Sequence, residues 1–208
     1  QWSHFGQSGY KERDILPGDY KYEDWNGDGE INGQDEHPFA FDQTPWLQFS
    51  LNAGLQWKNL DFNMLLQGSA LGSMEYKEPL HEIWGKNGGG ALKQFLDRWH
   101  PVDPKADPYD PSTVWTSGHY AYTGRWAKNN SAFNRVSTAY LRLKSIELGY
   151  TFPKLKQIPN ASLRIYANAY NLLTFTGVKF VDPEHPDDDL GRMYPLNKTY
   201  TLGVSLSF

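Results

Sequence analysis

The feature that most constrains the fold is a two-residue alternation of apolar and polar side chains. The final run, TYTLGVSLSF, has Thr, Gly or Ser at every second position and apolar residues between them. The run LQFSLNAGLQW, which begins at residue 47, repeats the pattern, and LDFNMLLQG follows it after Lys58 and Asn59. Successive side chains of a β-strand point to opposite faces, so these runs predict strands with one apolar face. We expect strands at about 46–57, 60–69, 139–152, 161–172 and 199–208.

Two further runs refine this pattern. SLRIYANAYNL, which begins at residue 162, sets apolar residues against a face that is polar and aromatic. In YLRLKSIELGYTF the apolar phase slips between Leu143 and Ile146. One extra residue in a strand shifts the phase in this way, so we predict a β-bulge near Lys144 and Ser145.

The lengths of the runs and of their connections predict a membrane barrel. Each run has about nine to thirteen residues, close to the length of a strand that crosses a bilayer at a tilt. The connections have about two, seventy, nine and twenty-six residues in chain order. Outer-membrane barrels alternate in the same way between tight periplasmic turns and long extracellular loops. We therefore expect an all-β fold in which residues 46–208 supply strands of a large transmembrane antiparallel β-barrel, with extracellular segments at 1–45, 70–138 and 173–198.

Five strands do not close such a barrel, because both edges of their sheet would stay unpaired in lipid. We expect the chain to be the C-terminal portion of a larger barrel, or a part that completes one with another polypeptide. The alternative is a secreted, calcium-stabilised β-sandwich that binds glycans. Sandwich strands also alternate, but they are usually shorter. Strand length and the alternation of short and long connections favour the barrel.

Composition removes several classes of protein. The chain has 208 residues, a net charge of −4 and no sustained cluster of Lys and Arg, which argues against nucleic acid as a partner. It has no cysteine, so a disulfide framework and thiolate chemistry are excluded. We expect neither a signal peptide nor a transmembrane helix, because no apolar run approaches the roughly 18 residues that such a helix needs.

The segment DWNGDGEINGQD, residues 24–35, has the spacing of a twelve-residue calcium loop. Calcium takes hard oxygen ligands from loop positions 1, 3, 5, 7 and 12, and position 7 ligates through its backbone carbonyl. These positions hold Asp24, Asn26, Asp28, Glu30 and Asp35. Prolines on both sides of the loop exclude the helices of an EF-hand. We predict structural calcium that orders an extracellular loop, and the alternative is an Asx-rich turn without metal.

Aromatic residues are concentrated in the segment 70–138. It contains four tryptophans, Trp84, Trp99, Trp115 and Trp126. Aromatic rings stack on sugar rings, so these residues are candidate contacts with a substrate or a partner. The alternative is that they form the core of the segment itself. Within it, LKQFLDRWH, residues 92–100, has the apolar spacing of a short amphipathic helix.

No motif predicts an enzyme. The acidic run DPEHPDDD, residues 182–189, has no partner residues at a fixed spacing, and we expect it to be a solvated surface. The alternatives are a second cation site, or paired carboxylates such as a fragment of a glycoside hydrolase would use. The histidines lack the spacing of a metal site, and the chain has neither a nucleophile elbow nor a phosphate loop.

Five longer stretches resemble one protein family. The chain is similar to the C-terminal part of SusC/RagA-type TonB-dependent outer-membrane transporters in LPGDYKYEDWNGDGEI, DRWHPVDP, YLRLKSIELGYTFP, LRIYANAYNLLTFTG and YPLNKTYTLGVSLSF. The resemblance covers nearly the whole chain. The terminal aromatic residue, Phe208, resembles the signal that the barrel-assembly machinery reads.

The resemblance implies a large closed barrel with an N-terminal plug, in the outer membrane of a Gram-negative bacterium. It also implies import of oligosaccharides or peptides, with a SusD-like surface lipoprotein as partner. TonB would supply energy through the N-terminal part, and outer-membrane lipid would cover the apolar face of the strands.

Overall fold

The structure is a computed structural model that describes residues 15–81, 91–124, 130–153, 161–185 and 192–208. The described residues form strands and three short 3-10 helices, η2 (Gly33–Asp35), η3 (Glu78–Leu80) and η4 (Lys93–Leu96). None of the described helices has the length and apolar character needed to span a membrane. The predicted all-β class is confirmed.

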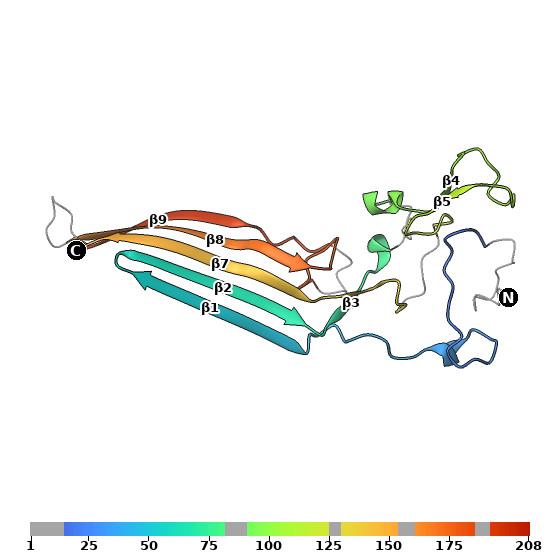
Figure 1. The fold of residues 1–208 in the computed structure, drawn as a ribbon, viewed down its shortest axis with the longest axis horizontal. Coiled ribbons are helices and arrows are strands. Elements are labelled where there is room, and N and C mark those ends of the chain that lie inside the picture. The colour runs from blue at the N-terminus through green and yellow to red at the C-terminus, as the bar shows by residue number, and fades with distance from the viewer. Residues whose placement is uncertain (1–14, 82–90, 125–129, 154–160, 186–191) are drawn as a thin grey trace. The chain divides into compact units, whose positions relative to one another are not determined.

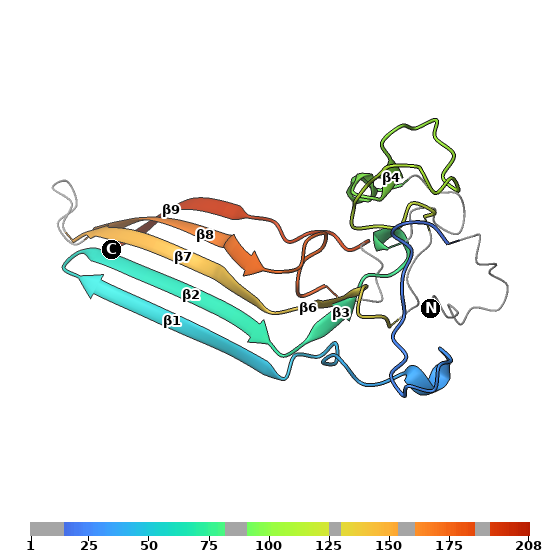
Figure 2. The ribbon, with the colours of Figure 1, turned by 45° about the vertical axis from the view of Figure 1, so that its right-hand side comes forward.

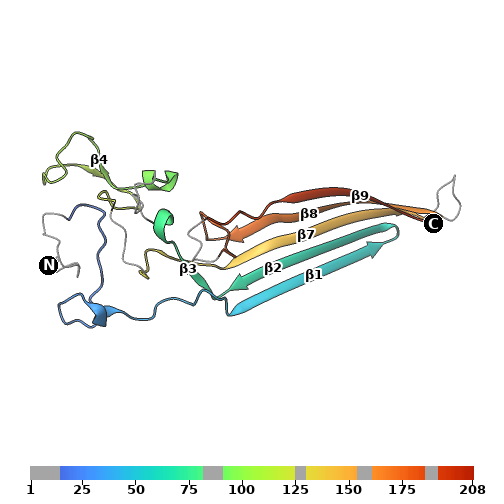
Figure 3. The ribbon, with the colours of Figure 1, turned by 180° about the vertical axis from the view of Figure 1, so that it is seen from behind.

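Five long strands form one antiparallel sheet in the order β1-β2-β7-β8-β9. Figure 1 shows them side by side in that order, and Figure 2 and Figure 3 show the same order from two other sides. The strands are β1 (Leu47–Trp57), β2 (Leu60–Ala70), β7 (Tyr140–Phe152), β8 (Ser162–Thr176) and β9 (Thr199–Ser207). The end of β8 lies four residues beyond the predicted end at 172, so the connection to β9 is shorter than predicted.

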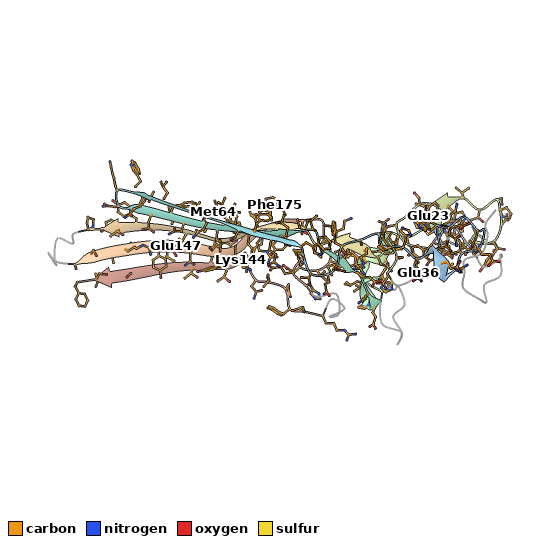
Figure 4. All side chains as sticks on the ribbon, turned by 90° about the horizontal axis from the view of Figure 1, so that it is seen from below. Glu23, Glu36, Met64, Lys144, Glu147 and Phe175 are labelled. Carbon is orange, nitrogen blue, oxygen red and sulfur yellow. The ribbon has the colours of Figure 1, made fainter. Side chains whose placement is uncertain are left out.

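The sheet has one apolar and one polar face, because paired residues of neighbouring strands point to the same side. Large apolar side chains on one face are exposed along the length of the strands: Leu51, Leu55, Trp57, Leu148, Ile165, Phe175, Leu202 and Val204. The other face carries Gln48, Ser50, Gln67, Arg142, Glu147, Arg164 and Thr201. Figure 4 labels Phe175 of the first set and Glu147 of the second, and also Met64, which is half-buried and belongs to the apolar face. The alternation of apolar and polar residues in the sequence therefore produces a sheet with one apolar and one polar face.

The register changes at one level of the sheet. Met64 pairs with Ile146, and Leu66 pairs with Leu143. Between these two pairs the chain advances by two residues in β2 but by three in β7. The partners of Ile146 and Leu143 in β8 are Ala169 and Leu173, so β8 advances by four residues over the same part of the sheet. Asn171, within those four steps of β8, has a positive φ of 53°. The bulge predicted in β7 is thereby confirmed.

The chain divides into two compact units. Unit 2, Phe41–Met74 and Val136–Phe208, contains the five-stranded sheet, and unit 1 comprises Gln1–Ala40 and Glu75–Arg135. Two small sheets complete the strand inventory of the described residues: β3 (Ser73–Glu75) with β6 (Arg135–Ser137), and β4 (His100–Pro101) with β5 (Trp115–Thr116).

The core of unit 1 is aromatic. Phe95 and Tyr120 are buried with their ring centroids 4.7 Å apart, and Phe133 packs against them. The amphipathic helix predicted from residue 92 is wrong, because only the four residues of η4 are helical. Within that stretch Phe95 is buried, whereas Leu92 and Leu96 are exposed. A helix of four residues has little stability of its own. The packing of the Phe95 ring therefore matters more to the conformation of this segment than helix propensity does.

Candidate functional site

The most deeply buried charge on the polar face belongs to Arg142 of β7. Its side chain is 1% exposed, and its guanidinium forms ion pairs with Asp182 and, at 2.6 Å, with Glu184. Its Nε donates a hydrogen bond to the Thr174 hydroxyl at 3.0 Å. A buried guanidinium needs compensating charge and acceptors, and these three groups supply both.

The two carboxylates come from the connection between β8 and β9. We call residues 182–185 the strap. Glu184 accepts hydrogen bonds from the Tyr140 hydroxyl and from the Gln67 side chain, the latter at 3.4 Å. Its backbone N–H donates to the Asp182 carboxylate at 3.0 Å, which closes a tight turn. The prediction that the acidic run 182–189 is solvated is therefore wrong for Asp182, which is half-buried against Arg142, whereas Glu184 is exposed and also pairs with that guanidinium. Residues 186–189 lie outside the described residues.

A hollow of about 820 Å³ lies beside the strap within unit 2. Residues of β1, β2, the start of β7 and the strap line it, and they include Gln48, Ser50, Gln67, Ser69, Tyr140 and Glu184. Thr138, just before β7, also lines the hollow. Most of these groups are neutral hydroxyls and amides, so the hollow can exchange hydrogen bonds with a polar solute.

A second ionic cluster crosses three strands of the same face. Arg164 of β8 bridges Asp61 of β2, with Nε 3.1 Å from one carboxylate oxygen, and Glu147 of β7 at 2.7 Å. Gly149 of β7 lies beneath the bridge to Asp61, and a Cβ there would be 2.6 Å from both of its carboxylate oxygens. Arg164 also lies over the ring of Tyr166, with 4.7 Å between the guanidinium carbon and the ring centroid. The bridge ties β2, β7 and β8 together at one level.

The predicted calcium loop is a set of Asx turns. The Asp24 carboxylate accepts N–H bonds from Gly27 at 2.7 Å and Gly29 at 2.8 Å. The Asn26 side-chain oxygen accepts from the N–H of Asp28 at 2.8 Å, and its amide donates to the Asp28 carboxylate at 2.9 Å. Such bonds fold a loop around its own side chains.

Asp35 closes the loop from its other end. Its carboxylate accepts N–H bonds from Asn32 at 2.8 Å, Trp25 at 2.9 Å and Asn26 at 3.4 Å. These bonds, that of Asn32 foremost, favour the ionised carboxyl group and lower its pKa below the ordinary value. Glu30 contributes its backbone N–H, which donates to Asp28 at 2.8 Å.

The loop brings hard oxygen atoms together without a ready-made cage for metal. Within the described parts of the chain, no three His, Cys, Asp or Glu side chains gather closely enough to hold a metal ion. Each carboxylate oxygen of Asp24 already accepts one N–H bond, but a carboxylate oxygen can accept more than one interaction. The donor set fits calcium chemically, and its occupancy stays a prediction.

Two of the four predicted tryptophans lie in described regions. Trp99 is half-buried in unit 1, and its ring lies where a side chain at residue 18 would stand. Trp115 packs edge-on against Tyr122, with ring centroids 5.1 Å apart. These contacts favour a role in the packing of unit 1, whereas contact with a substrate or partner stays a prediction. Trp84 and Trp126 lie outside the described residues.

Phe208 follows β9 and its side chain is 95% exposed. Its role as an assembly signal stays a prediction.

The two arginine clusters were not predicted from sequence patterns, because their members are far apart in the chain, as Asp61 and Arg164 are. The only hint was the placement of Arg142, Glu147 and Arg164 on the polar side of alternating runs.

Comparison with curated proteins identifies relatives. No family model matches the chain. It is 28% identical to TonB-dependent receptor P3 of Formosa agariphila over 94% of its length, and 27% identical to receptor P26 of the same organism over 97%. The chain spans about a fifth of the length of these relatives, 19% and 20% respectively. Because the relatives are receptors, the prediction that the chain is not an enzyme is confirmed.

Solved structures give the same result for the fold. The RagAB peptide transporter matches 86% of this chain and 19% of its own, with a TM-score of 0.62 and 22% identity. The RagAB peptide importer in its closed-closed state matches 93% of this chain and 21% of its own, with a TM-score of 0.59 and 22% identity. The chain is thus homologous to part of the TonB-dependent receptors, as the resemblance to the SusC/RagA type predicted, and has the fold found in a RagAB transporter.

Proposed function

We propose that the chain forms part of the wall of a TonB-dependent outer-membrane transporter. The observation that carries the proposal is the two-sided sheet. Its strands have nine to fifteen residues, and apolar side chains such as Phe175 and Leu202 are 64% and 76% exposed on one face. A continuous apolar face of this kind is rare on proteins that meet only water. Lipid would cover it, and the polar face with its arginine clusters would line the interior.

The secreted β-sandwich fits these observations less well. A sandwich packs the apolar faces of two sheets together, about 10 Å apart. In the described part of the chain there is one long sheet, and its apolar face is exposed rather than packed against another. Homology to TonB-dependent receptors also favours the transporter.

The resemblance and the solved neighbours support a proposal for the cargo and the partners. The solved neighbour is a peptide transporter, and the family that the sequence resembles also imports oligosaccharides. We propose import of one of these two solute classes along the polar face. We further propose a SusD-like lipoprotein as partner at the extracellular side, and TonB as the source of energy through the N-terminal part of the receptor.

Fractionation and uptake test this proposal. The intact receptor that carries this chain is expected in the outer membrane and should need detergent for extraction. Uptake of a labelled oligosaccharide or peptide mixture should fall to background when TonB is deleted and return when TonB is restored. A receptor that stays soluble without detergent, or uptake that is indifferent to TonB, would contradict the proposal.

We also propose that Ca²⁺ binds the loop 24–35 and orders it. The support is the convergence of Asp24, Asn26 and Asp28 on one compact turn that Asp35 closes. Extracellular calcium modules bind with Kd on the order of 10⁻⁴ to 10⁻³ M, so millimolar calcium should protect the loop from proteolysis and EDTA should reverse the protection.

The matched variants are Asp28→Ala, within the loop, and Asp103→Ala, outside it. Asp103 lies in an exposed Asx turn, where its carboxylate accepts a hydrogen bond from the backbone N–H of Lys105 at 2.9 Å. Calcium should no longer protect the first variant, whereas it should protect the second as well as the wild type. If the wild type is cleaved near Trp25 at the same rate with calcium and with EDTA, the proposal of a calcium site is wrong and the Asx turns alone order the loop.

A further inference from the structure

The segment that leads into β9 continues the alternation of that strand. Residues 194–198 contain neither a turn nor a bend and run directly into β9. The side-chain amide of Asn171 in β8 donates a hydrogen bond to the Asn197 carbonyl at 3.1 Å, so the end of the segment stays beside β8. In an extended chain every second side chain lies on the same side. The side chains that continue the apolar row of β9 are therefore Tyr194, Leu196 and Lys198.

The apolar row within β9 has the length of one membrane span. It runs from Tyr200 to Phe208, and a tilted strand of about nine to eleven residues crosses the hydrocarbon of a bilayer. Both ends of the row are aromatic, as in the aromatic girdles of membrane barrels. Lys198 thus follows directly outside the span. In the proposed transporter this end of β9 faces the cell exterior, because the connection before it is one of the long ones.

This segment combines exposed apolar side chains with positive charge. Tyr194 and Leu196 are 80% and 47% exposed. Lys198 and Arg192 are exposed cations at its two ends. Among the residues that the structure describes, no carboxylate forms an ion pair with Lys198. The segment therefore presents a cation beside apolar surface, at the level where a bilayer changes from hydrocarbon to headgroups.

The chemistry of the segment selects one occupant. Anionic lipid headgroups attract Lys and Arg close to the membrane surface, and aromatic rings lie at the headgroup level. A small anion in water would have no use for the exposed Tyr194 and Leu196, and a purely apolar ligand would leave the charge of Lys198 uncompensated. A lipid with a phosphate in its headgroup satisfies both parts of the segment.

We propose that residues 192–198 bind a phosphate-bearing lipid of the outer leaflet. The ammonium group of Lys198 and the guanidinium of Arg192 contact the phosphate, and Tyr194 and Leu196 lie against the upper part of the acyl chains. The proposal rests on the proposed transporter function, which puts the apolar face in lipid, and it adds the class of lipid and the place where its headgroup is held.

The test uses the intact receptor, purified in detergent, and native mass spectrometry with two lipids. One is monophosphoryl lipid A, and the other is the same lipid after enzymatic removal of its phosphate. The variants are Lys198→Gln and Arg192→Gln. The control is Lys105→Gln, which removes an exposed cation from a turn outside the segment. Each of the two variants should weaken binding of the phosphorylated lipid about 5-fold. Binding of the dephosphorylated lipid should stay the same, and Lys105→Gln should behave as the wild type does.

The remaining outcomes overturn the proposal. If the wild type binds both lipids equally, the phosphate is not recognised. If neither Lys198→Gln nor Arg192→Gln changes the affinity, the lipid is held elsewhere, and an equal loss for Lys105→Gln would mean attraction by net charge alone. Displacement of the lipid by an equal concentration of inorganic phosphate would identify a site for free anions. A shift in electrophoretic mobility on heating shows that each variant is folded. TonB dependence of uptake tests the proposed transport function separately.

Discussion

Tyr166 of β8 lies across Gly203 of β9, and a Cβ at residue 203 would overlap the phenol ring. The two residues pair directly in the register of the sheet. An aromatic side chain that covers a glycine of the neighbouring strand shields its backbone and fixes the pairing. The contact joins β8 to β9, the strand at the edge of the five-stranded sheet.

Gly203→Ala should therefore loosen the β8–β9 pair. The added methyl group displaces the Tyr166 ring, and overpacking of this kind typically costs about 1 to 3 kcal/mol. Urea unfolding of the reconstituted receptor measures the effect. Gly177→Ala is the control, because a Cβ at residue 177 would meet nothing within 4 Å. Equal stability of the two variants would remove the role assigned to the Tyr166 contact.

The two arginine clusters should differ in their contribution to stability. Arg142→Gln leaves Asp182 and Glu184 beside a buried site without their cation, and loss of one partner of a buried ion pair costs about 3 to 5 kcal/mol. Arg164→Gln should cost about 1 kcal/mol or less, because the Arg164 side chain is itself 29% exposed, against 1% for Arg142, so water screens its ion pairs. The same urea titration compares both variants, and a larger loss for Arg164→Gln would show that the strap is not anchored as described.

Charge on the two faces of β9 should have opposite consequences. Val204 is 66% exposed on the apolar face, and Arg at this position should cost roughly 2 to 4 kcal/mol if it lies near the bilayer midplane. Ser205 is its neighbour on the polar face, so Ser205→Arg should assemble. The amount of heat-modifiable, folded receptor in outer membranes gives the readout. Comparable losses for Val204→Arg and Ser205→Arg would mean that lipid does not cover the apolar face.

The loop 24–35 should loosen at low pH. Backbone N–H bonds, that of Asn32 first, hold the pKa of Asp35 below its ordinary value of 3.8. A depressed pKa in the folded state means that the ionised group stabilises the loop above the unfolded pKa. This stabilisation is lost as pH falls through the lower, folded value. Hydrogen exchange should show protected Asn32 and Trp25 amides above about pH 5, with protection lost in strong acid.

The variant Asp35→Asn provides the control for this titration. It should remove the pH dependence of the Asn32 amide, once intrinsic exchange rates are corrected, while the ladder amides of β7 keep their protection. If exchange at Asn32 has the same pH profile in wild type and variant, the Asp35 carboxylate does not hold the loop.

The long strands could be predicted because their pattern is local. Alternation from Thr199 onwards identifies β9 without any knowledge of its neighbours, and the phase slip after Leu143 locates the bulge. The end of β8 was harder, because Leu172 and Leu173 are adjacent apolar residues and the pattern stops being readable there. The structure continues the strand to Thr176 through Asn171 with its positive φ.

The clusters on the polar face could not be predicted, because their contacts join distant parts of the chain. Asp182 and Glu184 belong to an acidic run that composition alone assigns to solvent. Only the position of Arg142 on a neighbouring strand, with its side chain almost fully buried, draws them onto the sheet. The helix expected from residue 92 failed for a related reason. Phe95 packs against Tyr120 and Phe133. Helical periodicity within residues 92–100 could not predict contacts with residues so far along the chain.

The bulge in β7 also determines where this strand can change length during evolution. Leu141, Leu143, Ile146 and Leu148 all point to the apolar face. Deletion of Lys144 would leave these four residues in simple alternation, so the insertion or deletion of one residue there alters local curvature and keeps every side chain on its own face. One residue removed at Gly149 would instead turn Tyr150 and Phe152 to the polar face and Thr151 to the apolar face. Among homologous receptors, gaps in this strand should therefore gather at the bulge.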